Sequence, residues 1–204
     1  AMVFSFLHWG YHGWAVYILV ALSLGYFHFR KGLPLSIRSG LYPLIGDRIY
    51  GPVGHTVDIL AVFGTMFGIV TSLGLGVMQI STGLSRLFGT PDTVWIQLIL
   101  IAVITAFATT SVMLGLDKGI KHVSTFNIYL SFVLLAFITI LGPTLFILDS
   151  FIENMGNYFL ALIETSFWNE AYTGKSWQND WTLFYWAWWV SWSPFVGIFI
   201  ARIS

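Results

Sequence analysis

The amino-acid sequence predicts an all-α integral membrane protein with five transmembrane helices. Of its 204 residues, 57% are hydrophobic and only 9% are charged, and the mean hydropathy is +0.80. Soluble domains carry about 25% charged residues, so this composition excludes an ordinary globular protein. Five stretches are long and apolar enough to cross a hydrocarbon core of about 30 Å.

The five expected spans cover residues 3–27, 57–84, 94–116, 126–148 and 183–200, within a single transmembrane unit over 1–204. A cytoplasmic loop at 28–56 is rich in proline and glycine. A short amphipathic helix around 35–44 is expected to lie along the membrane surface there. The outer segment before the fifth span is too polar to cross the membrane. Its residues at about 151–167 have the apolar periodicity of a helix.

Lysine and arginine are concentrated on one side of the predicted spans. The loops after the first and third spans, with the end of the fifth, carry Arg30, Lys31, Arg38, Arg48, Lys118, Lys121 and Arg202. The other side carries Arg86 and Lys175 among the acidic residues Asp92, Asp149, Glu153, Glu164, Glu170 and Asp180. The positive-inside rule makes the first set cytoplasmic. The chain is therefore expected to start outside and finish inside.

Charged groups are scarce inside the spans. Apart from Asp58, near the inner end of the second span, they contain no acidic or basic residue. A relay of buried carboxylates would require several. No histidine box, nucleophile elbow or intramembrane aspartate pair is present, so we expect neither an enzyme nor a cofactor. A net charge of zero without a basic run argues against nucleic acid and leaves the lipid bilayer as the expected surrounding.

The fifth span carries a dense aromatic cluster, in which residues 185–195 read YWAWWVSWSPF. On a helix, Tyr185, Trp188 or Trp189, and Trp192 lie three or four positions apart and share one face. Pro194 removes a backbone donor inside this apolar segment. Clustered indole faces bind quaternary ammonium ions by cation–π attraction, at about 0.5–2 kcal/mol per ring. Residue chemistry alone leaves such a cage and an interfacial aromatic belt equally open.

A second aromatic group lies in the first span, where residues 8–17 read HWGYHGWAVY. Trp14 and Tyr17 are about one helical turn apart, and Trp9 lies before them, so the three rings are expected to line one wall. Gly10 and Gly13 would allow a neighbouring helix to approach closely.

Two further patterns have simpler interpretations. His8 and His12 have the spacing of a helical metal pair, but no carboxylate or second histidine pair completes a site, so we expect no metal. Gly64 and Gly68 form a small-xxx-small pair that is typical of tight helix packing. Beside them, Thr65 would either coordinate an ion or bond back to its own helix, and spacing alone favours the structural role.

These motifs together resemble the betaine/choline/carnitine transporters over the whole chain. The specific parts are residues 8–17, the run TSLGLG at 71–76, and above all WTLFYWAWWVSWSPFVG at 181–197, followed by ARIS at 201–204. The pair Gly13-Trp14 and the loop KGLPLSIRS at 31–39 are most similar to bacterial choline transporters of the BetT type, because betaine carriers tend to have proline at position 13.

The resemblance implies a twelve-span secondary transporter whose core is an inverted repeat of the LeuT-like kind. This chain would supply spans four to eight, in a bacterial inner (plasma) membrane. It also implies a substrate site near the bilayer midplane formed by Trp9, Trp14, Tyr17, Trp188, Trp189 and Trp192, with Trp186 and Phe195 beside the path. The expected substrate is choline or a related quaternary ammonium compound, imported for osmoprotection. Whether several copies assemble stays open.

One position departs from the sodium-coupled members that the chain resembles. They share Thr65 but carry a second hydroxyl residue one turn later, where this chain has Ile69. An isoleucine side chain cannot coordinate sodium, so Thr65 is expected to be a remnant of an ion site. Proton-coupled symport of choline is therefore the expected function. The alternatives are a sodium-coupled glycine betaine or carnitine carrier and a structural membrane subunit that does not transport.

Overall fold

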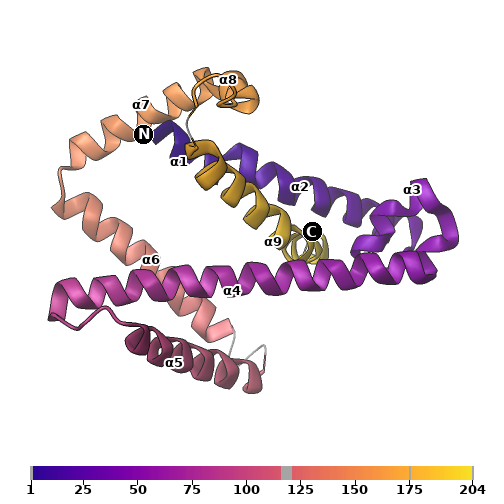
Figure 1. The fold of residues 1–204 in the computed structure, drawn as a ribbon, viewed down its shortest axis with the longest axis horizontal. Helices are drawn as coiled ribbons and strands as arrows, with labels where there is room; N and C mark the ends of the chain where they lie inside the picture. The colour runs from indigo at the N-terminus through magenta and orange to yellow at the C-terminus, as the bar shows by residue number, and fades with distance from the viewer. Residues whose placement is uncertain (1, 116–120, 175, 204) are drawn as a thin grey trace. The chain divides into compact units, whose positions relative to one another are not determined.

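The computed structural model describes residues 2–115, 121–174 and 176–203, and these form helices and connecting turns without a strand (Figure 1). The chain divides into two compact units. The first unit combines Ala1–Thr71 with Asn154–Ser204, and the second is Ser72–Glu153.

Five helical segments have the length and composition of membrane spans, which confirms the predicted number. They are Met2–Arg30, Pro52–Phe88, Val94–Met113, Lys121–Leu141 and Gln178–Ile203. Three of the sequence-based predictions lie outside the described residues. They are the end of the third span at Leu116 and the loop charges Lys118 and Lys175.

The first span consists of two α-helices and a π-helical end. Helix α1 covers Met2–Trp9, α2 covers Tyr11–Gly25, and η1 covers Tyr26–Arg30. The break lies at Gly10, whose φ of −96° and ψ of −142° are not helical. Because the last carbonyls of a helix lack partners within it, the break leaves the end of α1 free to bond elsewhere.

The loop after the first span forms short helical turns in place of the single helix expected around 35–44. A 3₁₀ helix, η2, covers Ile37–Leu41. It is followed by α3 at Tyr42–Ile45 and by a second 3₁₀ helix, η3, at Gly46–Tyr50. Pro34 and Ser39 explain the tight winding. The Ser39 hydroxyl donates to the Pro34 carbonyl oxygen at 2.5 Å, and this bond closes a compact turn.

The second span, α4, is a continuous helix over Pro52–Phe88. It begins five residues earlier and ends four residues later than the expected 57–84. At a rise of about 1.5 Å per residue its 37 residues extend for about 55 Å, well beyond a hydrocarbon core of about 30 Å. The third span, α5, covers Val94–Met113.

The fourth span ends earlier than the sequence predicts. Helix α6 covers Lys121–Leu141, and α7 begins after a break and covers Thr144–Leu160. The break falls at Gly142 and Pro143, since proline cannot continue the hydrogen bonding of a helix interior. Residues 144–148, which were expected to end the span, therefore begin α7. The outer helix predicted at 151–167 is divided between α7 and α8, which covers Leu162–Phe167.

The fifth span joins a π-helical turn, η5 at Gln178–Thr182, to α9 at Leu183–Ile203. Helix α9 continues through Pro194, although proline lacks the backbone donor of a helix interior. The Ser193 hydroxyl donates to the Val190 carbonyl oxygen at 2.8 Å, which is the acceptor that Pro194 leaves without its amide. A side-chain donor of this kind allows a proline within a membrane helix.

Helices α2 and α9 lie side by side in the first unit and form its main packed interface (Figure 1). The buried residues of α9 recur every fourth position: Trp189, Ser193, Gly197 and Ala201. On a helix these positions form one stripe. Three of the four residues are small, which lets two helix backbones approach closely in a membrane.

Candidate functional site

Trp189 is the first of the buried residues along α9, and it packs against Gly13 and Tyr17 of α2. Its side chain is buried, with 6% of the residue surface exposed. Its indole Nε1 donates a hydrogen bond of 2.8 Å to the backbone carbonyl oxygen of His8. This carbonyl belongs to the last turn of α1, where the break at Gly10 leaves acceptors without an amide of their own helix. The helix break therefore holds the indole in one orientation.

Three predicted site residues contact the ring of Trp189. Its ring centroid lies 4.7 Å from that of Tyr17, 5.7 Å from that of Trp9 and 6.2 Å from that of Trp14. The ring of Trp9 also meets Trp188 edge to face, at 5.6 Å. Five rings from α1, α2 and α9 thus form one aromatic cluster, which we define as Trp9, Trp14, Tyr17, Trp188 and Trp189.

The aromatic cluster is partly open. Tyr17 and Trp189 are buried, whereas Trp9 and Trp14 each expose about half of their surface. These two exposed rings line a cavity of about 440 Å³ together with Met155, Tyr158 and other residues of α2 and α7. The cavity has the size of a small-ligand site.

Trp192 lies apart from the aromatic cluster, on the side of α9 that faces α4. An ideal Cβ built on Gly68 would lie 2.5 Å from Cδ1 of Trp192, so the indole rests on the α4 backbone. The ring centroid of Phe195 is 5.8 Å away. Within the described part of the chain, Nε1 of Trp192 is buried without a hydrogen-bond partner. The structure therefore places Trp192 apart from the other five predicted cage residues, and Phe195, expected beside the path, lies next to Trp192.

Thr65, the predicted ion-site remnant, lies near Phe195. Both line a cavity of about 380 Å³ that also contacts Asp58, Met66 and Pro194. The Thr65 hydroxyl donates to the Ala61 carbonyl oxygen of its own helix at 3.0 Å. This back-bonding is the structural role that the sequence favoured for Thr65.

Asp58, near the beginning of α4, is paired with the loop between the first two spans. Nε of Arg38 lies 3.1 Å from Oδ2 of Asp58, and the backbone amide of Arg38 donates to Oδ1 at 3.1 Å. The loop is therefore fastened to α4 beside the cavity that contains Thr65.

The two histidines of the first span bond to hydroxyl groups, His8 to one at the start of the fifth span and His12 to two on α7 and α8. Nε2 of His8 lies 3.0 Å from the hydroxyl of Thr182, and His8 stacks on Tyr185 at 4.3 Å. Nδ1 of His12 lies 2.9 Å from the hydroxyl of Tyr158, and Nε2 lies 2.7 Å from that of Ser166. Burial raises the pKa of the Tyr158 phenol, which stays neutral at physiological pH.

Trp186, which the resemblance placed beside the path, lies close to both histidines. Its ring centroid is 6.3 Å from that of His8 and 6.2 Å from that of His12. In the described ranges, no three His, Cys, Asp or Glu side chains gather as a metal ion would require. His8 thus connects the first span to the fifth, and His12 connects it to α7 and α8.

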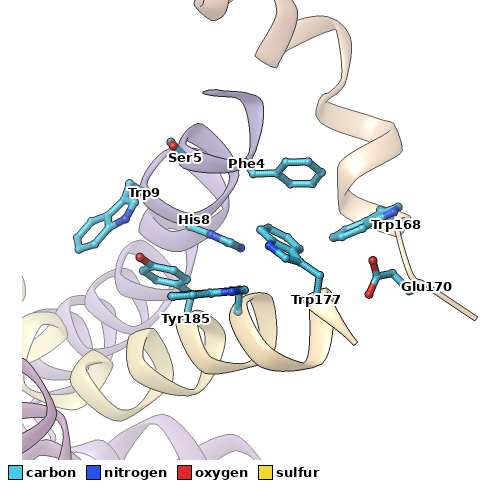
Figure 2. Close-up of a pocket in the computed structure, with 9 residues that line it drawn as sticks. Phe4, Ser5, His8, Trp9, Trp168, Glu170, Trp177 and Tyr185 are labelled. Carbon is cyan, nitrogen blue, oxygen red and sulfur yellow. The ribbon is translucent and has the colours of Figure 1, made fainter. Parts of the chain in front are cut away.

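Sequence reasoning missed a second aromatic cavity on the outer side (Figure 2). It measures about 640 Å³, and its wall includes Phe4, Trp168, Trp177, Trp181 and the carboxylate-bearing Glu170. The rings of Phe4 and Trp177 lie 4.8 Å apart. His8 and Trp9 also line this cavity, so it adjoins the aromatic cluster. The sequence did contain a signal for this cavity, because Trp168, Trp177 and Trp181 lie close together in the polar segment before the fifth expected span.

The comparisons with known proteins concern the whole chain. A model of the betaine/carnitine/choline family transporters matches residues 1–204. A glycine betaine transporter of Acinetobacter baylyi is 51% identical over 204 residues, which cover 100% of this chain and 31% of that protein. The high-affinity choline transport protein of Escherichia coli K12 is 50% identical over 208 residues, 100% of this chain and 30% of that protein.

A third relative is the glycine betaine transporter OpuD of Bacillus subtilis. It is 48% identical over 207 residues, which cover 100% of this chain and 40% of that protein. The chain thus spans about a third of the length of these relatives.

Proposed function

Because this chain belongs to the betaine/carnitine/choline transporter family over its whole length, we propose that it supplies five spans of a secondary transporter for quaternary ammonium compounds. The transporter imports choline or a close relative across the bacterial inner membrane. The spans correspond to numbers four to eight of a twelve-span protein with an inverted-repeat core. Substrate occupies a site near the bilayer midplane, about which the two halves of the molecule alternate.

The observation that supports this proposal is that the rings of the aromatic cluster gather around Trp9 and Trp189. Trp9, Trp14 and Tyr17 come from the first span, and Trp188 comes from the fifth, yet all five rings meet. A lipid-facing belt has no need of such convergence, because each of its rings anchors at the interface separately. Electron-rich faces gathered in one place suit a cation that has no N–H to donate.

The likeness to relatives supports the substrate class and not one compound. The relatives reported above include glycine betaine transporters and a choline transport protein at almost equal identity. Choline and glycine betaine share the trimethylammonium head that an aromatic cage would bind, so glycine betaine is the second candidate. We favour choline because of Gly13 and the loop at 31–39.

Proton coupling is part of the proposal. Ile69 offers no oxygen one turn beyond Thr65, and the Thr65 hydroxyl is engaged with the Ala61 carbonyl. Hard cations such as sodium are held by several oxygen ligands, whereas this stretch of α4 presents one. A sodium gradient therefore has no complete site here, and a proton gradient is the remaining common source of energy.

The test uses a full-length transporter that contains this chain, reconstituted in liposomes. Uptake of labelled choline is measured with a sodium gradient alone, with a pH gradient alone, and in empty liposomes as the control. We expect uptake with the pH gradient, loss of uptake when a protonophore collapses it, and no uptake with sodium alone. Strict sodium dependence would overturn the coupling. Uptake of glycine betaine without choline would replace the substrate.

A further inference from the structure

The loop between the first two spans places one residue between two cavities. Ile37, the first residue of η2, lines the cavity of about 380 Å³ together with Thr65 of α4 and Phe195 of α9. It also lines a second cavity of about 350 Å³, whose wall includes Leu24 of α2. Pro194 of α9 borders both cavities. Ile37 and Pro194 therefore stand together between the two spaces.

Pro194 is also the position at which α9 can bend. Its ring nitrogen carries no proton, and the Val190 carbonyl oxygen accepts a hydrogen bond from the Ser193 hydroxyl instead. Sharp bends in long helices occur mostly where a backbone hydrogen bond of this kind is missing. Because Ile37 borders the same two cavities as Pro194, we expect a bend of α9 at this point to be coupled to a displacement of η2.

Arg38, the residue after Ile37, fastens η2 to α4. Its backbone amide donates to Oδ1 of Asp58 at 3.1 Å, and its Nε lies 3.1 Å from Oδ2 of the same carboxylate. Nη1 of Arg38 also lies 3.3 Å from Nδ1 of His55. The side chains of Arg38 and Asp58 are 20% and 29% exposed. Water therefore reaches both charges, and the pair can separate without leaving either of them buried and unpaired.

The rest of the loop is held by other contacts. The Ser39 hydroxyl donates to the Pro34 carbonyl oxygen, and Ser39 is fully buried, so η2 keeps its shape as a compact turn. At the other end of the loop, Ile49 of η3 is fully buried. An ideal Cβ built on Gly54 would overlap the carbonyl group of Ile49, so η3 packs tightly against the first turn of α4. The loop is thus anchored at η3 and fastened a second time at Asp58.

We propose that η2 is a strap, held closed by the Arg38–Asp58 pair, that must open before substrate can leave on the side of the membrane where this loop lies. The inference rests on the proposed function, because a transporter has to open one side at a time. With the pair formed, Ile37 separates the two cavities and restrains α9 at Pro194. With the pair broken, η2 swings away about η3, the cavities join and α9 is free to bend. Arg38 and Asp58 do not touch the substrate and are positioning residues.

The first test follows the strap itself in a full-length transporter that contains this chain. Nitroxide labels are placed on Leu44→Cys, just after η2, and on Phe67→Cys of α4, two exposed positions. Pulsed electron paramagnetic resonance then gives the ratio of open to closed straps. Asp58→Asn keeps the shape of the side chain and removes its charge. We expect it to raise this ratio about tenfold, which corresponds to about 1.4 kcal/mol. An unchanged distribution of distances in Asp58→Asn would overturn the inference.

Matched variants separate the pair from general damage to the loop. Asp47 and Arg48 belong to η3 of the same loop, and Asp47→Asn and Arg48→Gln should leave the ratio of open to closed straps unchanged. Arg38→Gln should raise it as Asp58→Asn does, whereas Arg38→Lys keeps a positive charge and should raise it less. A ratio that rises equally in Asp47→Asn would show that loosening of the loop, and not the Arg38–Asp58 pair, moves the strap.

The second test asks whether transport needs the strap to open. Ser36 of the loop and Ala61 of α4 line the same cavity, so cysteines at these two positions can be joined by a short, cleavable thiol cross-linker. We expect the cross-linked transporter to bind labelled choline but to lose uptake, and cleavage of the cross-linker to restore uptake. Uptake that continues at its original rate in the cross-linked protein would refute the role of the strap in transport.

A double variant keeps the first test decisive if neither single variant folds. The combination of Arg38→Gln with Asp58→Asn leaves no charge without its partner, so it carries the distance measurement in their place. A closed strap in this double variant would refute the inference. The distance measurement requires no substrate. If the unaltered transporter takes up no quaternary ammonium compound, the proposed function fails, whereas a strap that does not respond to loss of the pair is a failure of this inference alone.

Discussion

Helices α9 and α5 are both apolar spans of nearly equal length, with 21 and 20 residues. They differ in how many side chains each buries within its own unit. Helix α9 buries Trp189, Ser193, Gly197 and Ala201 within its unit, whereas α5 buries none of its residues. The span formed by α5 is the more hydrophobic of the two, with a mean hydropathy of 2.1 against 1.3 for the fifth span. Hydropathy therefore identifies both spans but gives no indication of which one carries the site.

The physical reason lies in the solvent of a membrane helix. Lipid tails are as apolar as leucine, so burying leucine against another helix gains little there. Close approach of small residues and side-chain hydrogen bonds bring such helices together instead. Serine, glycine and tryptophan lower the hydropathy of α9, and these are the residues that bind it to α2. In α5, leucine, isoleucine and valine remain on the outside.

The largest effect that would sharpen this comparison is expected at Trp189. Trp189→Leu keeps the residue apolar but deletes the electron-rich face. The loss of about 1–2 kcal/mol for a desolvated cation corresponds to choline affinity that is roughly five- to thirty-fold weaker. Trp189→Phe keeps a weaker π face and should lose less. Binding of labelled choline to the purified full-length transporter measures both variants.

A tryptophan of α5 supplies the matched control. Trp95 is 77% exposed at the beginning of that helix, and Trp95→Leu should leave choline affinity unchanged. If Trp95→Leu weakened choline binding as much as Trp189→Leu, the burial of a tryptophan within its unit would not indicate a role in substrate binding. Equal affinity in the unaltered protein and both Trp189 variants would make Trp189 a packing residue only.

This contrast explains how far the sequence could predict the site. The spacing of Trp9, Trp14 and Tyr17 predicted one wall, and the structure brings these three rings to Trp189. Residue types and helical periodicity were sufficient for this step, because they fix the face on which each side chain lies. Spacing could not reveal the acceptor of the indole N–H, since that depends on the break at Gly10.

The position of Trp192 shows the limit of the same reasoning. Trp192 follows Trp188 and Trp189 by about one turn, so periodicity grouped all three. The structure instead places Trp192 against Gly68 of α4, because a second helix packs on an adjacent side of α9. Similarly, the fourth span was predicted to end at residue 148, whereas α6 ends at Leu141. The apolar run continues past Pro143, so composition gave no sign of the break there. Contacts between helices that are distant in sequence carry this information, and a single sequence does not contain it.

A smaller effect is expected where α2 is joined to the outer helix α7. Tyr158 is 2% exposed, and its hydroxyl lies 2.9 Å from Nδ1 of His12. Tyr158→Phe keeps the ring and removes the hydroxyl, which leaves a polar atom of His12 without this partner. We expect a loss of about 1 kcal/mol in the free energy of unfolding. Thermal unfolding in detergent, followed through the yield of folded full-length protein, measures it.

The comparable change in an unpacked helix is Tyr129→Phe. Tyr129 belongs to α6 and is 68% exposed. Its substitution should not change the unfolding midpoint. A midpoint that falls equally in both variants would mean that the His12 connection adds nothing beyond the loss of any tyrosine hydroxyl.

The smallest effect is expected at Asp92, whose carboxylate joins the beginning of α5 to α4 by hydrogen bonds. The Ser81 hydroxyl donates to Oδ1 of Asp92 at 2.5 Å, and the Gln97 side-chain amide donates to the same oxygen at 3.3 Å. These bonds, that from Ser81 foremost, lower the pKa of the Asp92 carboxyl below its ordinary value. A carboxyl whose pKa is lowered on folding stabilises the fold above its unfolded pKa of about 3.9. That stabilisation is lost as the pH falls through the lower, folded pKa.

A nitroxide label on Leu87→Cys, at the exposed end of α4, would report this loosening by electron paramagnetic resonance. As the pH is lowered, the label should become mobile with a midpoint below the ordinary carboxyl value. Ser81→Ala removes the principal donor and should move the midpoint upward, whereas Asp92→Asn should abolish the transition. Asp149→Asn, on α7, serves as the control and should leave the midpoint in place. A midpoint that does not respond to Ser81→Ala would mean that α5 is held by contacts other than this carboxylate. Hydrogen bonding to Asp92 would then not distinguish α5 from the packed helix α9.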